Sequence, residues 1–126
     1  MFRIILYVAA GSSVGGVARY LSQHAVQKYF PSSFPWGTLA VNITGCFLIG
    51  LIYALSEKGN VLSPEVRILL ATGFCGGFTT FSAFAFENTR LINDGQYLYT
   101  GLYIAASVIL GILAVYLGAL LIRLMS

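Results

Sequence analysis

The charged residues of this chain stand so far apart that four long uncharged runs lie between them, residues 4–18, 29–56, 68–86 and 95–122. A helix that crosses a bilayer needs about 20 mostly apolar residues. Three runs approach or exceed that length alone, and the first does so if its helix includes Arg19. We therefore expect an all-α integral membrane protein with four transmembrane helices, over roughly residues 3–28, 35–56, 64–91 and 96–123.

Composition supports a membrane protein with a single domain over residues 1–126. Only 9% of the residues are charged and the mean hydropathy is +0.85, whereas about one quarter of the residues of a soluble domain are charged. The first run resembles a signal peptide, but the rest of the chain is itself apolar, so we interpret this run as a span. The seven Lys and Arg residues are too scattered to form a basic patch, and no nucleic acid is expected as a partner.

Residue types needed for enzymatic chemistry are sparse. The only histidine, His24, falls near the end of a span, no two carboxylates share a helix face, and no metal-ligand spacing occurs. Cys46 and Cys75 lie inside predicted spans, where we expect them to be small buried hydrophobic residues. We therefore do not expect an enzyme.

Small residues in the first span favour close helix packing. Gly11 and Gly15 form a small-xxx-small face, and Arg19 follows one turn later. An arginine at this depth should face protein, water or the interface. Before the third span, Ser63 is expected to be the N-cap and Pro64 the first helical residue.

The segment TGFCGGFTTFSAF, residues 72–84, interrupts the third uncharged run. Paired glycines weaken a helix and Thr or Ser side chains compete for its carbonyls, so a break is predicted between Cys75 and Thr80. Inside a membrane, freed carbonyls must meet protein, water or an ion, and they are suitable ligands for an alkali cation. Beyond the break, Phe81 and Phe84 share one helix face and offer ring edges to an anion or ring faces to a cation.

Polar residues in the second and fourth spans need partners in the bilayer. Asn42 shares a face with Thr38 and Gly45, and either bonds a neighbouring helix or lines a polar pathway. Tyr103 and Ser107, with Gly111 and Gly118, form a second small-and-polar stripe.

The basic residues give only a weak orientation signal, and no internal repeat is present. Four fall on one side of the predicted bilayer and two on the other: Arg3, Lys58, Arg67 and Arg123 against Lys28 and Arg90. A two-fold symmetric pathway would therefore require pairing of two chains in opposite orientations.

These residues make the chain resemble the fluoride-channel family, Fluc or CrcB. The resemblance covers nearly the whole sequence and rests on GFCGGFTTFSAF at residues 73–84, WGTLAVN at 36–42, GGVAR at 15–19 and the pair Tyr103 and Ser107. The family pattern more often has hydroxyl residues where this chain has Ala83 and Ala85, and a serine where it has Gly111. These departures are expected to alter conduction more than the fold.

The resemblance implies a fluoride-selective passive channel in a bacterial or archaeal cytoplasmic (inner) membrane. It implies an antiparallel, dual-topology homodimer with a structural sodium ion at its centre, bound by the main-chain carbonyls of Gly76 and Thr79. By the same resemblance, Arg19 and Glu87 have vestibule or structural roles, and the pore and fluoride site is formed by Phe81, Phe84, Asn42, Tyr103, Ser107, Thr38 and Thr80.

Two other functions fit the composition. A small proton-coupled multidrug-type exporter needs a titratable group inside the membrane, and Glu87 is the only carboxylate far into a span. An assembly subunit would use its glycines and hydroxyls only to pack helices.

Overall fold

The computed structural model describes residues 1–59 and 61–125, and in these ranges every regular element is a helix. Four candidate membrane spans agree with the four predicted helices. Three are the continuous helices α1, α2 and α6, and the remaining one is a composite of shorter segments. The bounds are α1 Phe2–Tyr29, α2 Trp36–Ser56, α3 Pro64–Arg67, the π-helical η1 Ile68–Cys75, α4 Gly76–Phe78, α5 Phe81–Asn93 and α6 Tyr97–Leu124.

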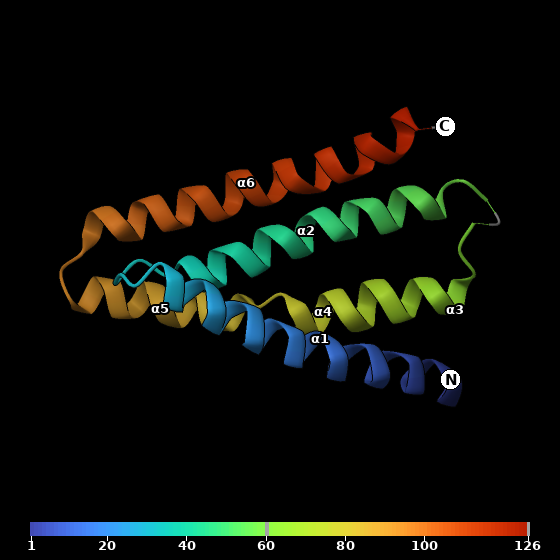
Figure 1. The fold of residues 1–126 in the computed structure, drawn as a ribbon, viewed down its shortest axis with the longest axis horizontal. Coiled ribbons are helices and arrows are strands. Elements are labelled where there is room, and N and C mark those ends of the chain that lie inside the picture. The colour runs from blue at the N-terminus through green and yellow to red at the C-terminus, as the bar shows by residue number, and fades with distance from the viewer. Residues whose placement is uncertain (60, 126) are drawn as a thin grey trace.

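The helices form a bundle in which both chain termini lie at the same end (Figure 1). α2 packs along α6, and α1 packs against η1, α4 and α2. Two ion pairs lie at the end that holds the termini, Arg3–Glu65 at 3.8 Å and Arg123–Glu57 at 3.5 Å. These basic residues were predicted to share one side of the membrane, and the bundle places them at one end.

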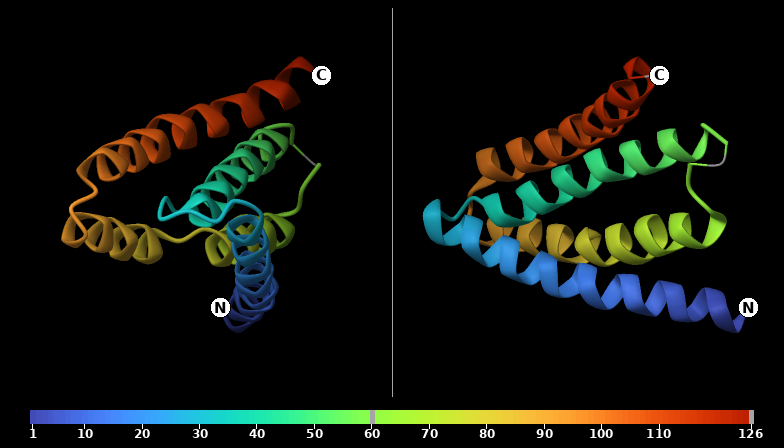
Figure 2. Two further views of the ribbon diagram at one scale, coloured as in Figure 1. Left: turned by 60° about the vertical axis from the view of Figure 1, so that its left-hand side comes forward. Right: turned by 45° about the vertical axis from the view of Figure 1, so that its right-hand side comes forward.

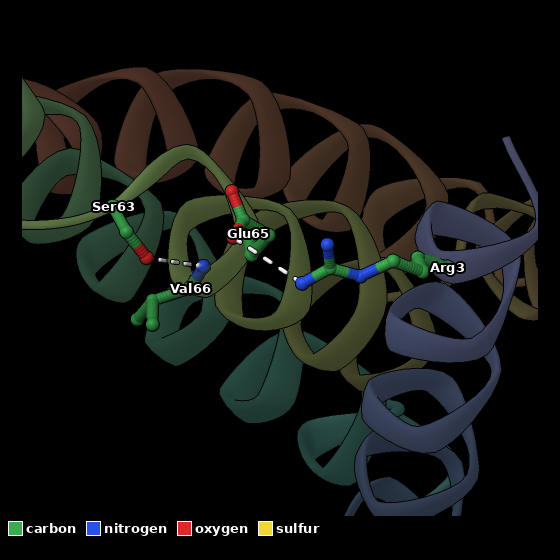
Figure 3. Close-up of polar contacts among 4 residues, drawn as sticks. All are labelled: Arg3, Ser63, Glu65 and Val66. Carbon is green, nitrogen blue, oxygen red and sulfur yellow. Dashed lines mark hydrogen bonds and ion pairs between the residues drawn. The ribbon is translucent and has the colours of Figure 1, made fainter.

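The composite third span starts as its sequence predicts. The Ser63 hydroxyl accepts a hydrogen bond from the Val66 amide at 3.2 Å, and Pro64 is the first helical residue. Figure 3 shows this cap beside Glu65 and its ion-pair partner Arg3. The side chains of Arg3 and Glu65 are 76% and 44% exposed, so the ion pair contributes little stability. The cap is what fixes the helix start.

Glycines allow the backbones of α1 and the third span to touch. A β-carbon on Gly11 would collide with the carbonyl oxygen of Leu69, and one on Gly15 with that of Phe74. Both glycines are buried. The predicted small-residue face of the first span is therefore confirmed, and η1 is the segment that it contacts.

The third span is broken at Thr79 and Thr80, which adopt extended conformations with φ of −98° and −151°. Gly76 and Gly77, expected to be part of the break, are instead helical within α4. Gly77 is needed for packing, because a β-carbon there would lie 2.6 Å from the carbonyl oxygen of Ser12. The break also redirects the chain: α4 contacts α1, whereas α5 contacts α6 and, in the described ranges, has no contact with α1 (Figure 2).

Candidate functional site

Asn42, from the middle of α2, holds the broken backbone in place. Its Oδ1 accepts a hydrogen bond from the Thr80 amide at 2.7 Å, and its Nδ2 donates to the Thr80 carbonyl at 3.0 Å. One side-chain amide thus replaces both of the helical hydrogen bonds that Thr80 would make. Of the two interpretations open from the sequence, the structure displays the bond to a neighbouring helix. The second N–H of the amide remains free to donate elsewhere.

The Thr80 side chain starts the next helix. Its Oγ1 accepts from the Ala83 amide at 3.1 Å, so Thr80 is the N-cap of α5. The same hydroxyl lies 3.3 Å from that of Ser82. Thr80 therefore has a clear structural role in addition to its predicted place in a pore.

Three carbonyls at the break receive no hydrogen bond from any described residue, those of Gly76, Phe78 and Thr79. Their neighbours are paired: Cys75 accepts from both the amide and the hydroxyl of Thr79, and Gly77 accepts from Arg19 Nε at 3.1 Å. A β-carbon built on Gly76 would meet no neighbouring helix within 4 Å in the described ranges. Two of these three carbonyls, those of Gly76 and Thr79, belong to the residues predicted to bind sodium.

Aromatic rings form a row from the surface into the core. Phe81 is 78% exposed, and its ring centroid lies 5.6 Å from that of Phe84. Phe84 is half-buried and lies 4.9 Å from the ring of Tyr103, which is fully buried. The two phenylalanines do share one helix face, and Tyr103 extends their row to α6.

Glu87 is the point where α2, α5 and α6 meet through polar side chains. Tyr103 donates its hydroxyl hydrogen to Oε1 at 2.8 Å, and Thr38 donates to Oε2 at 2.7 Å. Thr38 is 1% exposed. Both donors were predicted pore residues, and the structure turns their hydroxyls toward this carboxylate.

Arg19 is linked to Glu87 by a chain of hydrogen bonds. Arg19 Nη1 donates to Gln23 Oε1 at 3.3 Å, and Gln23 Nε2 donates to the Thr38 hydroxyl at 2.9 Å. Thr38 in turn donates to Glu87. Gln23 was not among the predicted site residues, although its position four residues after Arg19 on one helix face was the available signal.

This network borders a cavity of about 410 Å³. The lining is mainly polar and comes from α1, α2, α5 and the connection after α1: Arg19, Tyr20, Gln23, His24, Gln27, Ser32, Pro35, Thr38, Glu87 and Arg90. A smaller cavity, about 310 Å³, lies at the break and is lined in part by Asn42, Thr79, Thr80 and Phe81. Seven of the predicted residues therefore line one cavity or the other, whereas Phe84, Tyr103, Ser107 and Gly76 line neither.

Ser107 lies one helical turn beyond Tyr103 on α6. Its Oγ is buried and has no hydrogen-bond partner among the described residues. A buried hydroxyl without a partner is uncommon and calls for a ligand or a water. The two cysteines are unpaired, with Cys75 buried and Cys46 half-buried, as expected of packing residues.

Comparison with known proteins gives a consistent result over nearly the whole chain. A family model described as "CrcB-like protein, Camphor Resistance (CrcB)" matches residues 6–119. A "Fluoride-specific ion channel FluC" from Chlorobium phaeobacteroides (strain BS1) is 49% identical over 123 residues, which are 98% of this chain and 95% of that protein. A protein of the same name from Flavobacterium psychrophilum is 44% identical over 119 residues, 94% of this chain and 96% of its own length.

Proposed function

This chain belongs to the CrcB family, and from that premise we propose that it is a passive, fluoride-selective channel that lets fluoride leave the cell. Its relatives are named as fluoride-specific ion channels. The family is one of channels rather than of enzymes, and we extend that to this chain. Its four spans make it a multi-pass membrane protein, which we assign to the bacterial cytoplasmic membrane.

The observation that carries the proposal is the row of rings from Phe81 through Phe84 to Tyr103 beside a polar break. Fluoride is small and strongly hydrated, and moving an isolated ion into an apolar interior costs tens of kcal/mol unless other donors replace water. The edges of aromatic rings carry partial positive charge and can replace part of the water around fluoride. They do so without a fixed cation, which would bind the ion too tightly for it to leave. Binding of moderate strength is what conduction requires.

Other groups complete the proposed path. The unused N–H of Asn42 lies at the cavity that Phe81 lines, and the unpartnered hydroxyl of Ser107 lies one turn from Tyr103. Thr80 contributes a hydroxyl along the same route, because its structural bond uses it only as an acceptor. The single hydroxyl hydrogen of Thr38 is donated to Glu87, so Thr38 serves the path by holding that carboxylate.

An antiparallel homodimer is supported by the polar backbone groups and the aromatic ring that remain exposed at the break of the single chain. Lipid does not hydrogen-bond the backbone, so the free carbonyls of Gly76 and Thr79 require protein, water or an ion beside them. Phe81 is exposed next to them. A second copy in the opposite orientation covers the break with its own break and brings two sets of rings about a two-fold axis.

We propose that a sodium ion lies on this axis. The donor set fits, because unwound backbone carbonyls are the oxygen ligands that sodium sites in membrane proteins use. Gly76 and Thr79 of each copy would hold it, and when bound it would supply positive charge that neutralises four converging carbonyl dipoles. The role of the ion is structural.

The test is fluoride efflux from liposomes that contain the purified protein, measured with a fluoride electrode. We expect rapid fluoride loss and little chloride loss from matched vesicles. Equal chloride flux would contradict the proposed selectivity, and the absence of flux for any ion would favour an assembly subunit.

The proton-coupled exporter is distinguished by its driving force. Such a transporter loads and unloads a proton on a carboxylate, and here Glu87 is held by two hydroxyl donors. We expect a pH gradient without a fluoride gradient to drive no transport of a cationic drug. Uptake that depends on the pH gradient and disappears in Glu87→Gln would favour the exporter instead.

A further inference from the structure

Two arginines line the larger cavity, and their side chains differ in what they bind. Arg19 on α1 donates to the Gly77 carbonyl and to Gln23. Arg90, in the last turn of α5, is exposed, and its guanidinium makes no hydrogen bond or ion pair with any described residue. Arg19 is therefore part of the framework, whereas the charge of Arg90 is available to ions in the cavity.

Arg90 also decides the sign of the charge on the cavity wall. The only carboxylate in the lining is Glu87, whose two oxygens are occupied by Tyr103 and Thr38. With His24 neutral, two arginines and one carboxylate give the lining a formal charge of +1. Without Arg90 the formal charge of the lining is zero, so its attraction for an anion is weaker.

We propose that Arg90 gathers fluoride into this cavity through its electric field, without binding the ion in the pore itself. This role of Arg90 rests on the proposed channel function, and it would set the rate at which fluoride enters the channel. A charged cleft with walls of low dielectric concentrates ions of opposite sign. For a unit charge roughly 10 Å from the ion path, with an effective dielectric constant of about 40 to 80, the local fluoride concentration rises about two- to fourfold.

The experiment compares Arg90→Gln and Arg90→Lys with the wild-type chain. The matched control is Lys28→Gln, because Lys28 is exposed in the last turn of α1 at the same end of the bundle but is absent from the cavity lining. Initial fluoride efflux from liposomes is measured at low fluoride in about 0.01 M and about 1 M potassium gluconate, where the screening length is about 30 Å and 3 Å. Size-exclusion chromatography checks that each variant assembles as the wild type does.

In low salt we expect Arg90→Gln to slow efflux about two- to fourfold, while Arg90→Lys and Lys28→Gln remain close to wild type. In high salt the four proteins should conduct alike. If the wild type conducts but Arg90→Gln equals it in low salt, the inference is wrong while the channel function stands. A loss that persists in high salt, or an equal loss in Lys28→Gln, also overturns it. If the wild type moves no fluoride, the channel function itself is wrong.

Discussion

Phe81 and Phe84 are one turn apart on α5 and have different surroundings. Phe81 is mostly exposed, and Phe84 packs against Tyr103. Because isoleucine is apolar but has no ring edge, Phe81→Ile and Phe84→Ile should each raise the barrier for fluoride by about 1.4 kcal/mol or more, which is about tenfold or more in rate. Phe86→Ile is the control, since Phe86 is also exposed on α5 but is not part of the row. The measurement is fluoride efflux, and unchanged rates in both test variants would place the pore elsewhere.

Asn42 is expected to matter for stability as well as for flux. Asn42→Ala removes the partner of both the amide and the carbonyl of Thr80, and each buried polar group left unpaired costs about 1–3 kcal/mol. We expect a lower thermal unfolding temperature in detergent and loss of efflux. Thr44→Ala, at a nearby exposed position on α2, should change neither. A variant of Asn42 with wild-type stability would contradict the bridging role.

Single residues differ in how far the sequence predicts them. The sequence identifies Asn42 as a polar residue that needs a partner, but it leaves two alternatives open, because the partner lies 38 positions away on another helix. Gln23 was missed for a related reason. The hydrogen bond from Gln23 to Thr38 depends on the angle at which α1 and α2 cross, and helical periodicity in the sequence gives no information on that crossing angle.

At the scale of one element, some features of the third span follow from local sequence, and others depend on contacts with other helices. Its length and its N-cap are set by local sequence, and both are as predicted. The break is predicted, but its position is shifted toward Thr79 and Thr80. Glycines and β-branched residues all weaken a helix by similar amounts, so local propensity leaves several positions for a break. The amide of Asn42, on a different helix, selects one of them.

The packing role of Gly77 can be tested directly. Gly77→Ala places a β-carbon against the Ser12 carbonyl and the Gly16 amide of α1. We expect an overpacking cost of about 1–3 kcal/mol, only partly offset by a gain of about 1 kcal/mol in helix propensity. The control is Gly101→Ala, because a β-carbon at Gly101 meets nothing within 4 Å. Thermal unfolding should separate the two variants, and equal unfolding temperatures would argue against close α1–α4 packing.

At the scale of the whole molecule, the proposed sodium ion and the proposed dimer depend on each other. Four carbonyl dipoles that converge on one axis repel one another unless a cation lies between them. Replacing sodium with N-methylglucamine should therefore lower the unfolding temperature of the dimer and reduce fluoride efflux. Restoring sodium should reverse both effects. A dimer whose stability and efflux do not depend on sodium would leave the carbonyls of Gly76 and Thr79 without the proposed ligand.

The hydrogen-bond chain from Arg19 to Glu87 has a consequence for the energy supply of a cell. Protons hop along a wire only if each member takes up one proton while it releases another. The amide of Gln23 occupies the middle of this chain and holds its hydrogens fixed, so these side chains do not themselves relay protons. A channel built on this framework would thus add no proton relay through these side chains that dissipates the proton-motive force of the cell.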